Sequence, residues 1–230
     1  MNPLALIVTS FIAALQLALG AVVAQAETVS PTLAWSFDRE QPGTLPSEFS
    51  IGTLFDGRPA GDWQVLATDR AKSPPYVLAQ LMAKGAEHAY KVVLLKKVIT
   101  SDLNLEVSFL PIQGQADMGG GLIWRATDDR NYYLARANPL EQNIRVYRIV
   151  NGIRHQLQNF DQTITLKQWH TLRVTHQGCR VNIFYDDKQV FDLCDKTFHD
   201  GMIGLWTKSD AVTYFDDLQL QHLKSAQTRQ

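Results

Sequence analysis

Apolar residues recur at every second position along several short stretches of the chain, and no long window carries a helical period. Residues 103–109 (LNLEVSF) alternate without a break, and residues 172–175 (LRVT) repeat the pattern. Because successive side chains of a strand point to opposite faces, each stretch predicts a strand with one buried face. Turn signals separate about a dozen such strands, too many for a small barrel. The pattern predicts an all-β fold, a two-sheet antiparallel jelly-roll sandwich.

An Asn-Gly pair marks the clearest hairpin in the sequence. Asn151 and Gly152 stand between two strand-like runs, residues 145–150 and 153–157. Both central positions of a two-residue hairpin turn favour a positive φ, which Asn and Gly adopt readily. We therefore expect the chain to reverse direction at this pair.

The two cysteines of the chain flank a second predicted hairpin, with residues 186–187 (DD) as its turn. With a two-residue loop, the strand register places Cys179 directly opposite Cys194. Directly opposed residues have Cα atoms roughly 5 Å apart, within disulfide range. An oxidising compartment then predicts a disulfide between them. Two free thiols are the alternative, if the chain stays in the cytosol or the hairpin carries a bulge.

The first 26 residues contain no Lys, Arg, Asp or Glu, and residues 4–23 are almost wholly apolar. The run ends in Ala24-Gln25-Ala26, a small-x-small site typical of a cleaved secretory signal. We expect a signal peptide at 1–26, one domain at 27–223 and a flexible tail at 224–230, with a periplasmic or secreted product. An uncleaved membrane anchor is the alternative, because the n-region lacks a basic residue.

The net charge and the distribution of basic residues limit which kinds of partner the protein is expected to bind. The chain has 22 Lys and Arg against 23 Asp and Glu, a net charge of −1, and the basic residues are scattered. Nucleic acid and anionic membrane surfaces are attracted by basic stripes, which are absent from the sequence. We therefore expect neither nucleic acid nor, after signal cleavage, the membrane as a partner.

Several local runs together carry a resemblance to a known family. They are residues 119–125 (GGGLIWR), 131–139 (NYYLARANP), 169–174 (WHTLRV), 204–208 (GLWTK) and 214–218 (YFDDL). In combination they resemble the 3-keto-disaccharide hydrolase-like domain family, of the concanavalin A-like lectin/glucanase superfamily with its laminin-G-like sandwich. The resemblance covers the mature chain. It implies two curved sheets, a carbohydrate ligand on the concave one, and hydrolysis of 3-keto-glycosides.

Ordinary glucanase chemistry does not match the sequence. Retaining hydrolysis needs two carboxylates about 5 Å apart. Glucanases of this superfamily usually carry them in a Glu-x-Asp-x-x-Glu or Glu-x-Asp-x-Glu pattern, and neither pattern occurs here. Glu106 is the one acidic residue of its predicted strand. This departure argues against an active glucanase of that type.

The chemistry implied by the resemblance needs one general base and a group that stabilises an enolate. A ketone at C3 acidifies the C2 proton, so a base can remove it and expel the C1 substituent before water adds. We select Asp210 and Glu141 as candidate bases, ahead of Asp128, His170 and His199. Arg125, Arg136 or Lys208 could stabilise the oxyanion, as could a bound divalent metal. The alternative is that the acids and histidines are solvated loop residues.

A group of aromatic, basic and amide residues falls at strand positions that could share one face. Sugars stack their C–H faces on aromatic rings while polar groups bind the hydroxyls. If the rings fill the core instead, the cations only extend past them to solvent. The candidate carbohydrate-binding residues are Arg125, Tyr132, Arg136, Asn138, Trp206 and Lys208.

Asp38, near the first strand, and Asp216, on the last, suggest a calcium site that joins the chain ends. Carboxylate oxygens suit this ion, and superfamily members often bind calcium. Asp216 could instead bind loop amides. No other cofactor is implied. The leading expectation is an exported, carbohydrate-active sandwich that hydrolyses 3-keto-glycosides, and the rival is a non-catalytic glycan-binding or cell-surface interaction module.

Overall fold

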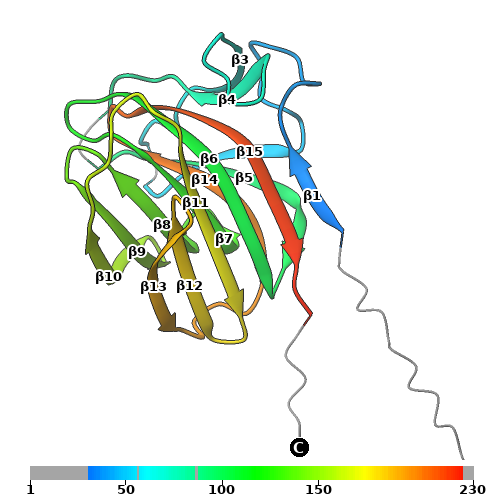
Figure 1. Ribbon diagram of the computed structural model, residues 1–230, viewed down its shortest axis with the longest axis vertical. Helices are drawn as coiled ribbons and strands as arrows, with labels where there is room; N and C mark the ends of the chain where they lie inside the picture. Colours follow the sequence, from blue (N-terminus) through cyan, green and yellow to red (C-terminus); the bar gives the residue numbers. More distant parts are fainter. Residues whose placement is uncertain (1–30, 56, 86–87, 225–230) are drawn as a thin grey trace, which may run out of the picture.

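The computed structural model describes residues 31–55, 57–85 and 88–224, which form fifteen β-strands arranged in two sheets (Figure 1). The predicted signal peptide lies outside the described residues, as does the predicted tail beyond Lys224. No helix in the described part of the chain is long and apolar enough to cross a membrane. All strand pairings among the described residues are antiparallel, which confirms the predicted all-β, two-sheet jelly-roll sandwich.

The eight-stranded sheet, sheet A, has the order β13-β12-β11-β6-β15-β4-β3, and β1 pairs with β15 beside this path. Its strands are β1 (Thr32–Trp35), β3 (Trp63–Ala67), β4 (Tyr76–Gln80), β6 (Leu103–Gln113), β11 (His170–Gln177), β12 (Arg180–Tyr185), β13 (Lys188–Cys194) and β15 (Val212–His222).

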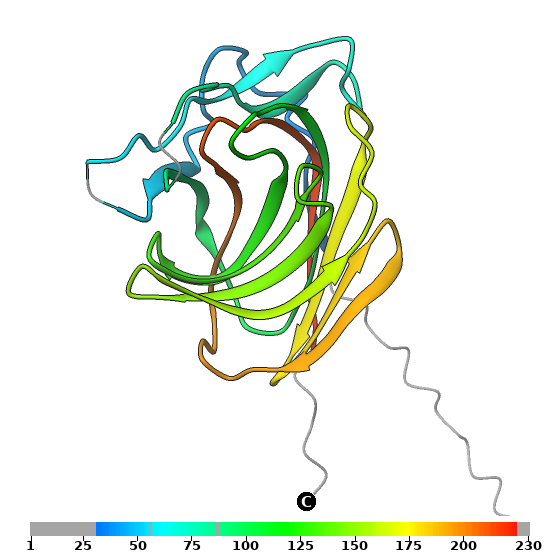
Figure 2. The same cartoon turned by 90° about the vertical axis from the view of Figure 1, so that its left-hand side faces the viewer.

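The seven-stranded sheet, sheet B, has the order β10-β9-β8-β7-β14-β5-β2. Its strands are β2 (Phe49–Thr53), β5 (Tyr90–Thr100), β7 (Gly120–Asp128), β8 (Asn131–Asn138), β9 (Asn143–Val150), β10 (Ile153–Asp161) and β14 (Gly201–Lys208). Figure 2 shows how strongly these strands curve, with sheet A beside them.

The main core lies between the two sheets and follows the alternation seen in the sequence. Leu103, Leu105, Val107 and Phe109 on β6 are all fully buried in it. Ala135 and Ala137 of β8 face them from sheet B. Burying a Leu, Val or Phe side chain contributes roughly 1.5–3 kcal/mol, so this face pairing drives the sandwich together.

Sheet B also buries its outer face, the one turned away from sheet A. A second cluster there includes Tyr132, Tyr147 and Trp206. Four strands separate β10 from β5, yet the Arg154 guanidinium of β10 lies 5.2 Å from the Tyr90 ring centre on β5 and 4.8 Å from that of Tyr147. Sheet B therefore curls until its two sides meet over this cluster.

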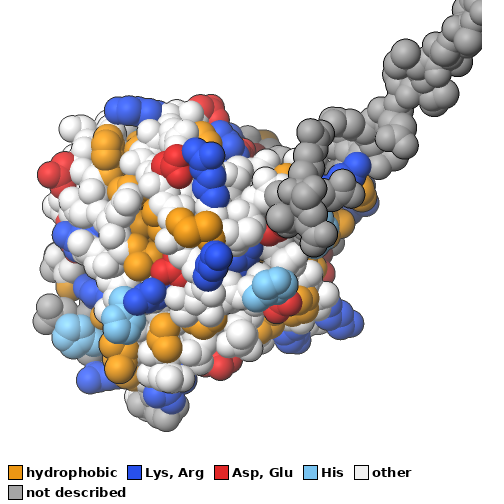
Figure 3. Space-filling model, turned by 90° about the horizontal axis from the view of Figure 1, so that it is seen from below, with side chains coloured by type: hydrophobic (Ala, Val, Ile, Leu, Met, Phe, Trp, Pro, Cys, Tyr) orange, Lys and Arg blue, Asp and Glu red, His pale blue; other side chains and the backbone are white. Residues whose placement is uncertain are grey.

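Charge is mixed over the surface. On the face drawn in Figure 3, Lys and Arg side chains are interspersed with Asp and Glu, and no continuous basic area is visible. Such an arrangement gives little long-range attraction for a polyanion.

Both predicted hairpins are present. Asn151 and Gly152 have φ of 51° and 79°, and Asp186 and Asp187 have φ of 44° and 63°, the positive values that two-residue hairpin turns require. Asp186 tolerates this conformation while its carboxylate accepts the Thr171 N–H at 2.8 Å.

The predicted disulfide between Cys179 and Cys194 is confirmed, with Cα atoms 4.8 Å apart. The register that led to it was wrong by one residue. A bulge between Ile183 and Phe184 shifts the pairing, so that Arg180 rather than Cys179 stands opposite Cys194. The bond still forms because the two Cα atoms remain within disulfide reach.

We expect the Cys179→Ser/Cys194→Ser double variant to lose about 3 kcal/mol of unfolding free energy, because the bond closes a loop of 15 residues. Urea unfolding with and without reductant measures this. Reductant should destabilise the wild type and leave the double variant unchanged. A wild type indifferent to reductant would contradict the prediction.

Candidate functional site

Five of the six residues predicted to contact sugar do share the outer face of sheet B. Ala135 and Ala137 point into the main core, so their neighbours on β8 point outward. On β14 the same alternation turns Leu205 inward, and its neighbours outward. The outward set is Tyr132, Arg136, Asn138, Trp206 and Lys208.

The two aromatic residues of this set are not available for stacking. Tyr132 is fully buried and Trp206 is 2% exposed. Both belong to the second cluster, which is covered where sheet B curls over itself. The prediction that they form a sugar platform is therefore corrected: they fill a core, and their bulk supports the polar residues beside them.

The polar residues gather at one end of the same face, where β7, β8, β9 and β14 meet the loops. Glu141, in the β8–β9 turn, accepts from Arg136 Nη2 at 2.9 Å and pairs with Arg145 Nη1 at 2.8 Å. Arg136 Nη1 also donates to Asn143 Oδ1 at 2.7 Å. We call the following set the polar cluster: Asp117, Arg136, Asn138, Glu141, Asn143, Arg145 and Lys208.

Asparagines complete the geometry around Glu141. Asn138 Oδ1 accepts the Leu140 and Glu141 amides at 2.9 and 3.2 Å, which fixes the turn. Asn143 Nδ2 donates to the Glu141 carbonyl at 3.2 Å. Arg136, Asn138, Glu141 and Asn143 are thus held by hydrogen bonds to one another, so this half of the cluster is fixed before any ligand arrives.

Solvent reaches the cluster from one side. The side chains of Glu141 and Arg145 are 37% and 29% exposed, whereas that of Arg136 is 4% exposed. Burial opposes ionisation of Glu141, but the charge and hydrogen bond of Arg136, with the charge of Arg145, outweigh it and lower its pKa. Glu141 is therefore a fixed anion with acceptor capacity left for a ligand.

Asp117 and Lys208 form the other half of the cluster. Lys208 Nζ lies 3.3 Å from Asp117 Oδ2, and Asp117 is 4% exposed. Burial raises the pKa of Asp117, although the charges of Lys208 and Arg136 oppose the shift. The charge of Arg136 thus acts on Asp117 as well as on Glu141.

Three members of the polar cluster, Asp117, Asn143 and Arg145, escaped the sequence analysis. The signal for two of them was present. Residues 139–142 form a turn, so the hairpin register places Asn143 opposite Asn138 and Arg145 opposite Arg136, as the structure has them. Asp117 lies in a loop, and no local pattern marks it.

Asp210, predicted as a general base, is a structural anchor. Its two oxygens accept the amides of Gln115, Ala116 and Asp117 at 2.7–3.2 Å. Burial would raise its pKa, but these amide hydrogen bonds outweigh burial and lower it. Asp210 thereby holds the loop that carries Asp117 and contributes to the site through its neighbour.

The other candidate bases lie away from the polar cluster. His170 on β11 contacts Asp186 at 2.8 Å. Asp128 accepts the Arg130 amide at the β7–β8 turn, at 2.7 Å. His199 is in the exposed loop between β13 and β14. The structure brings none of these three to the polar cluster.

Contrary to the sequence prediction, Arg125 does not share a face with the other candidate sugar-binding residues. It sits in a register break of β7 with φ of 48°, and this turns its side chain out of the strand's alternation. Its guanidinium donates to the carbonyls of Ser101 and Phe198 at 2.8 and 3.0 Å and pairs with Asp102. Arg125 therefore stabilises loops beside sheet A and lies apart from the other five candidates.

Arg125 also acts on a buried histidine. Its Nη1 lies 2.9 Å from His176 Nε2, and Trp124 Nε1 donates to His176 Nδ1 at 3.0 Å. Burial, reinforced by the Arg125 charge, lowers the pKa of His176 from 6.5 to about 4. The folded state therefore favours the neutral ring.

We expect this to make the fold acid-sensitive. Between pH 6.5 and 4, His176 binds a proton in the unfolded chain but stays neutral in the folded chain. The free energy of unfolding therefore falls as pH falls, by about 3 kcal/mol for a pKa shift of this size. Urea unfolding of wild type and His176→Gln at pH 7 and pH 4 measures the difference.

The test compares variants because the pKa of His170 shifts in the opposite direction to that of His176. The two histidines therefore have opposite effects on how stability changes with pH. The Asp186 carboxylate and the Thr165 carbonyl accept hydrogen bonds from the His170 ring and raise its pKa against the effect of burial, so its contribution is present below its unfolded pKa and lost as pH rises. His155→Gln, an exposed control, should keep the wild-type slope. An equal slope in His176→Gln would contradict the assignment.

Asp38 and Asp216 do not fit the predicted calcium site. Asp216 accepts the amides of Lys72 and Ser73 at 3.0 and 2.9 Å, and Asp38 accepts that of Tyr76 at 3.2 Å. Calcium takes six to eight oxygens, and no group of three or more His, Cys, Asp or Glu in the described residues could hold a metal ion. These carboxylates anchor the loop before β4, the alternative that the sequence left open.

Comparison with known proteins places the fold. The chain matches no family model. It is 26% identical over 128 residues to a levanase of Bacillus subtilis (strain 168), a match that covers 54% of this chain and 18% of the levanase. The chain thus spans less than a fifth of that relative's length.

Among solved structures, the chain is similar to the carbohydrate binding module CBM66 from Bacillus subtilis, with a TM-score of 0.60 and 21% identity over 76% of this chain and 95% of that one. The VIP36 exoplasmic/lumenal domain, in a Ca²⁺- and mannose-bound form, gives 0.56 and 11% over 86% and 91%. A native glycosidic hydrolase gives 0.54 and 12% over 86% and 98%. At these identities the likeness shows the fold alone.

Proposed function

We propose that this protein binds a carbohydrate, without cleaving it, through the polar cluster at the end of the outer face of sheet B. One observation carries the proposal: Glu141 is clamped between Arg136 and Arg145, yet 37% of its side chain is exposed. A charged acceptor fixed beside charged donors suits neighbouring sugar hydroxyls, because each hydroxyl both donates and accepts.

The surroundings of Glu141, which is held between Arg136 and Arg145, favour ligand binding over catalysis. A general base works best with a pKa near the operating pH. The pKa values of Glu141 and Asp210 are both lowered instead, by arginines and by backbone amides respectively. Rigid, fully ionised groups bind hydroxyls well and accept protons poorly.

The comparisons support a sugar and suggest which one to test. The matched relative is a levanase, and the similar solved structures include a carbohydrate binding module and a mannose-bound domain. Levan is therefore the first ligand for this chain, and mannose the second.

We expect Glu141→Gln to weaken levan binding at least tenfold, because the amide keeps the shape of the side chain and loses the charge that two arginines hold. Affinity electrophoresis of the purified protein in levan-containing gels, followed by calorimetry, measures this. Arg145→Ala should weaken binding to a similar degree.

The chain offers matched controls on sheet A. Glu106 is 36% exposed and pairs with Arg173, so Glu106→Gln makes the same change far from the site. Arg180→Ala removes an exposed arginine paired with Asp192. Both controls should bind levan like the wild type. Unchanged binding by Glu141→Gln and Arg145→Ala would exclude the polar cluster as the site.

Hydrolysis of 3-keto-glycosides is the second candidate, and the state of Asp117 favours it. A carboxyl whose pKa is raised by burial, 3.3 Å from Lys208, pairs a proton acceptor with a cation that could stabilise an enolate. Asp117 would take the C2 proton, the C1 substituent would leave, and water would add to the double bond.

For this second function we expect Asp117→Asn to lower kcat about a hundredfold on a 3-keto-disaccharide, measured as free sugar released above the spontaneous rate. Asp192→Asn, an exposed carboxylate on sheet A, is the control. Wild-type turnover no faster than the spontaneous reaction, or an Asp117→Asn variant as active as wild type, would exclude this candidate.

We also propose that the protein works outside the cytoplasm. A disulfide links Cys179 and Cys194, and such bonds persist chiefly in oxidising compartments. The uncharged, apolar residues 1–26 suit an export signal. Fractionation of the native host with N-terminal sequencing tests this, and a cytosolic product that retains residue 1 would contradict it.

A further inference from the structure

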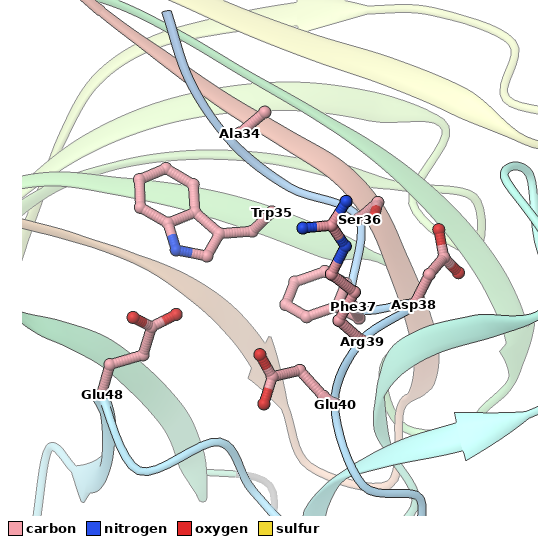
Figure 4. Close-up of a pocket in the computed structure, with 8 residues that line it drawn as sticks. All are labelled: Ala34, Trp35, Ser36, Phe37, Asp38, Arg39, Glu40 and Glu48. Carbon is pink, nitrogen blue, oxygen red and sulfur yellow. The ribbon is translucent and has the colours of Figure 1, made fainter.

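A pocket separate from the polar cluster opens at the side of the sandwich, between the end of β1 in sheet A and the start of β2 in sheet B. Figure 4 shows its lining. Its volume is about 250 Å³, enough for one small ring or a short chain. The lining residues are Ala34, Trp35, Ser36, Phe37, Asp38, Arg39, Glu40 and Glu48.

Two aromatic rings form one wall of this side pocket. Trp35 is half-buried and packs with part of its surface against the main core, which leaves the rest for the pocket. Phe37 is 4% exposed, and its ring centre lies 6.3 Å from that of Phe49. Core packing therefore holds both rings in place, so they form a rigid wall.

Two glutamates face these rings. In Figure 4 the carboxyl groups of Glu40 and Glu48 lie on the same side of Trp35 and Phe37. Among the described residues, neither carboxylate makes an ion pair or a hydrogen bond, and Arg39 pairs with neither of them. Both charges are thus uncompensated within the described chain, beside aromatic faces.

The rest of the lining does not neutralise them. Asp38 is the third carboxylate of the pocket, and its Oδ1 is occupied by the Tyr76 amide. Three carboxylates against the single guanidinium of Arg39 leave the lining net negative. A cation is therefore attracted, and an anion is repelled.

The three carboxylates of the lining do not form a metal-binding cluster, since no group of three or more His, Cys, Asp or Glu among the described residues could hold a metal ion. An ammonium group differs, because it needs one or two carboxylates and gains further from the face of an aromatic ring within about 6 Å. Its carbon skeleton would also cover the apolar wall.

We propose that the side pocket binds a small organic ammonium ion, such as the protonated amine of an amino sugar. The ammonium pairs with Glu40 and Glu48, and the ring or chain that carries it lies against Trp35. This site shares no residue with the polar cluster, so it stands whether or not the polar cluster binds levan.

The test is a titration of the ¹⁵N-labelled full mature chain, following the Trp35 indole N–H by NMR at pH 6 and constant ionic strength. The ligands are glucosamine, N-acetylglucosamine, glucose and Nα-acetyl-lysine methylamide. We expect saturable shifts at Trp35 and neighbouring residues with glucosamine, at least tenfold weaker affinity with the two neutral sugars, and weakening by salt. Tighter binding of the lysine derivative than of glucosamine would support the ammonium site and assign it to a peptide.

Variants make the result decisive. Glu40→Gln/Glu48→Gln should lower the glucosamine affinity at least tenfold while the melting temperature stays unchanged, since both side chains lie at the surface without partners in the described chain. Glu106→Gln is the matched control. Equal shifts with glucose and glucosamine, no saturable shift with any amine, or full affinity in the double variant would each overturn the proposal.

Discussion

The structure depends on the burial of both faces of sheet B. An antiparallel sheet commonly leaves one face to solvent, but here the outer face carries its own apolar cluster and curls until Arg154 of β10 covers Tyr90 of β5. Because the sheet closes in this way, the two large rings of Tyr132 and Trp206 are buried on its outer face. The polar cluster lies at one end of the same face, and we attribute its rigidity to the packed rings beside it.

The rigidity of the polar cluster explains why its acidic residues favour ligand binding over proton transfer. Glu141 and Asp210 are each surrounded by donors, which keep them ionised and fixed. Asp117 is the exception, because burial raises its pKa. A site made mostly of fixed charges recognises hydroxyl groups at little cost in conformational entropy. Within the polar cluster, the raised pKa of Asp117 is what supports the second candidate function.

Local patterns in the sequence predicted what depends on local geometry. Alternation at residues 103–109 identified a core strand, and the paired aspartates at 186–187 identified a turn with positive φ. The disulfide followed from hairpin pairing, although a bulge moved the register by one residue. The same reasoning applied to the β8–β9 turn would have found Asn143 and Arg145.

Features that depend on distant contacts were not predictable in this way. Tyr132 and Trp206 do face outward, but their burial follows from the curl of sheet B, which no short stretch encodes. Arg125 left the expected face because of a backbone irregularity in β7. Asp117 owes its place to Asp210, which is 93 residues away along the chain.

The most direct test of the account is a map of the amide and side-chain resonances that shift when a levan oligosaccharide is titrated into the labelled protein. We predict saturable shifts centred on Arg136, Asn138, Glu141, Asn143, Arg145 and Lys208, with the sheet A surface around Arg173 and Arg180 unchanged. Saturable shifts confined to another surface, or none with levan, mannose or any other sugar tested, would contradict the claim that the polar cluster is a carbohydrate-binding site.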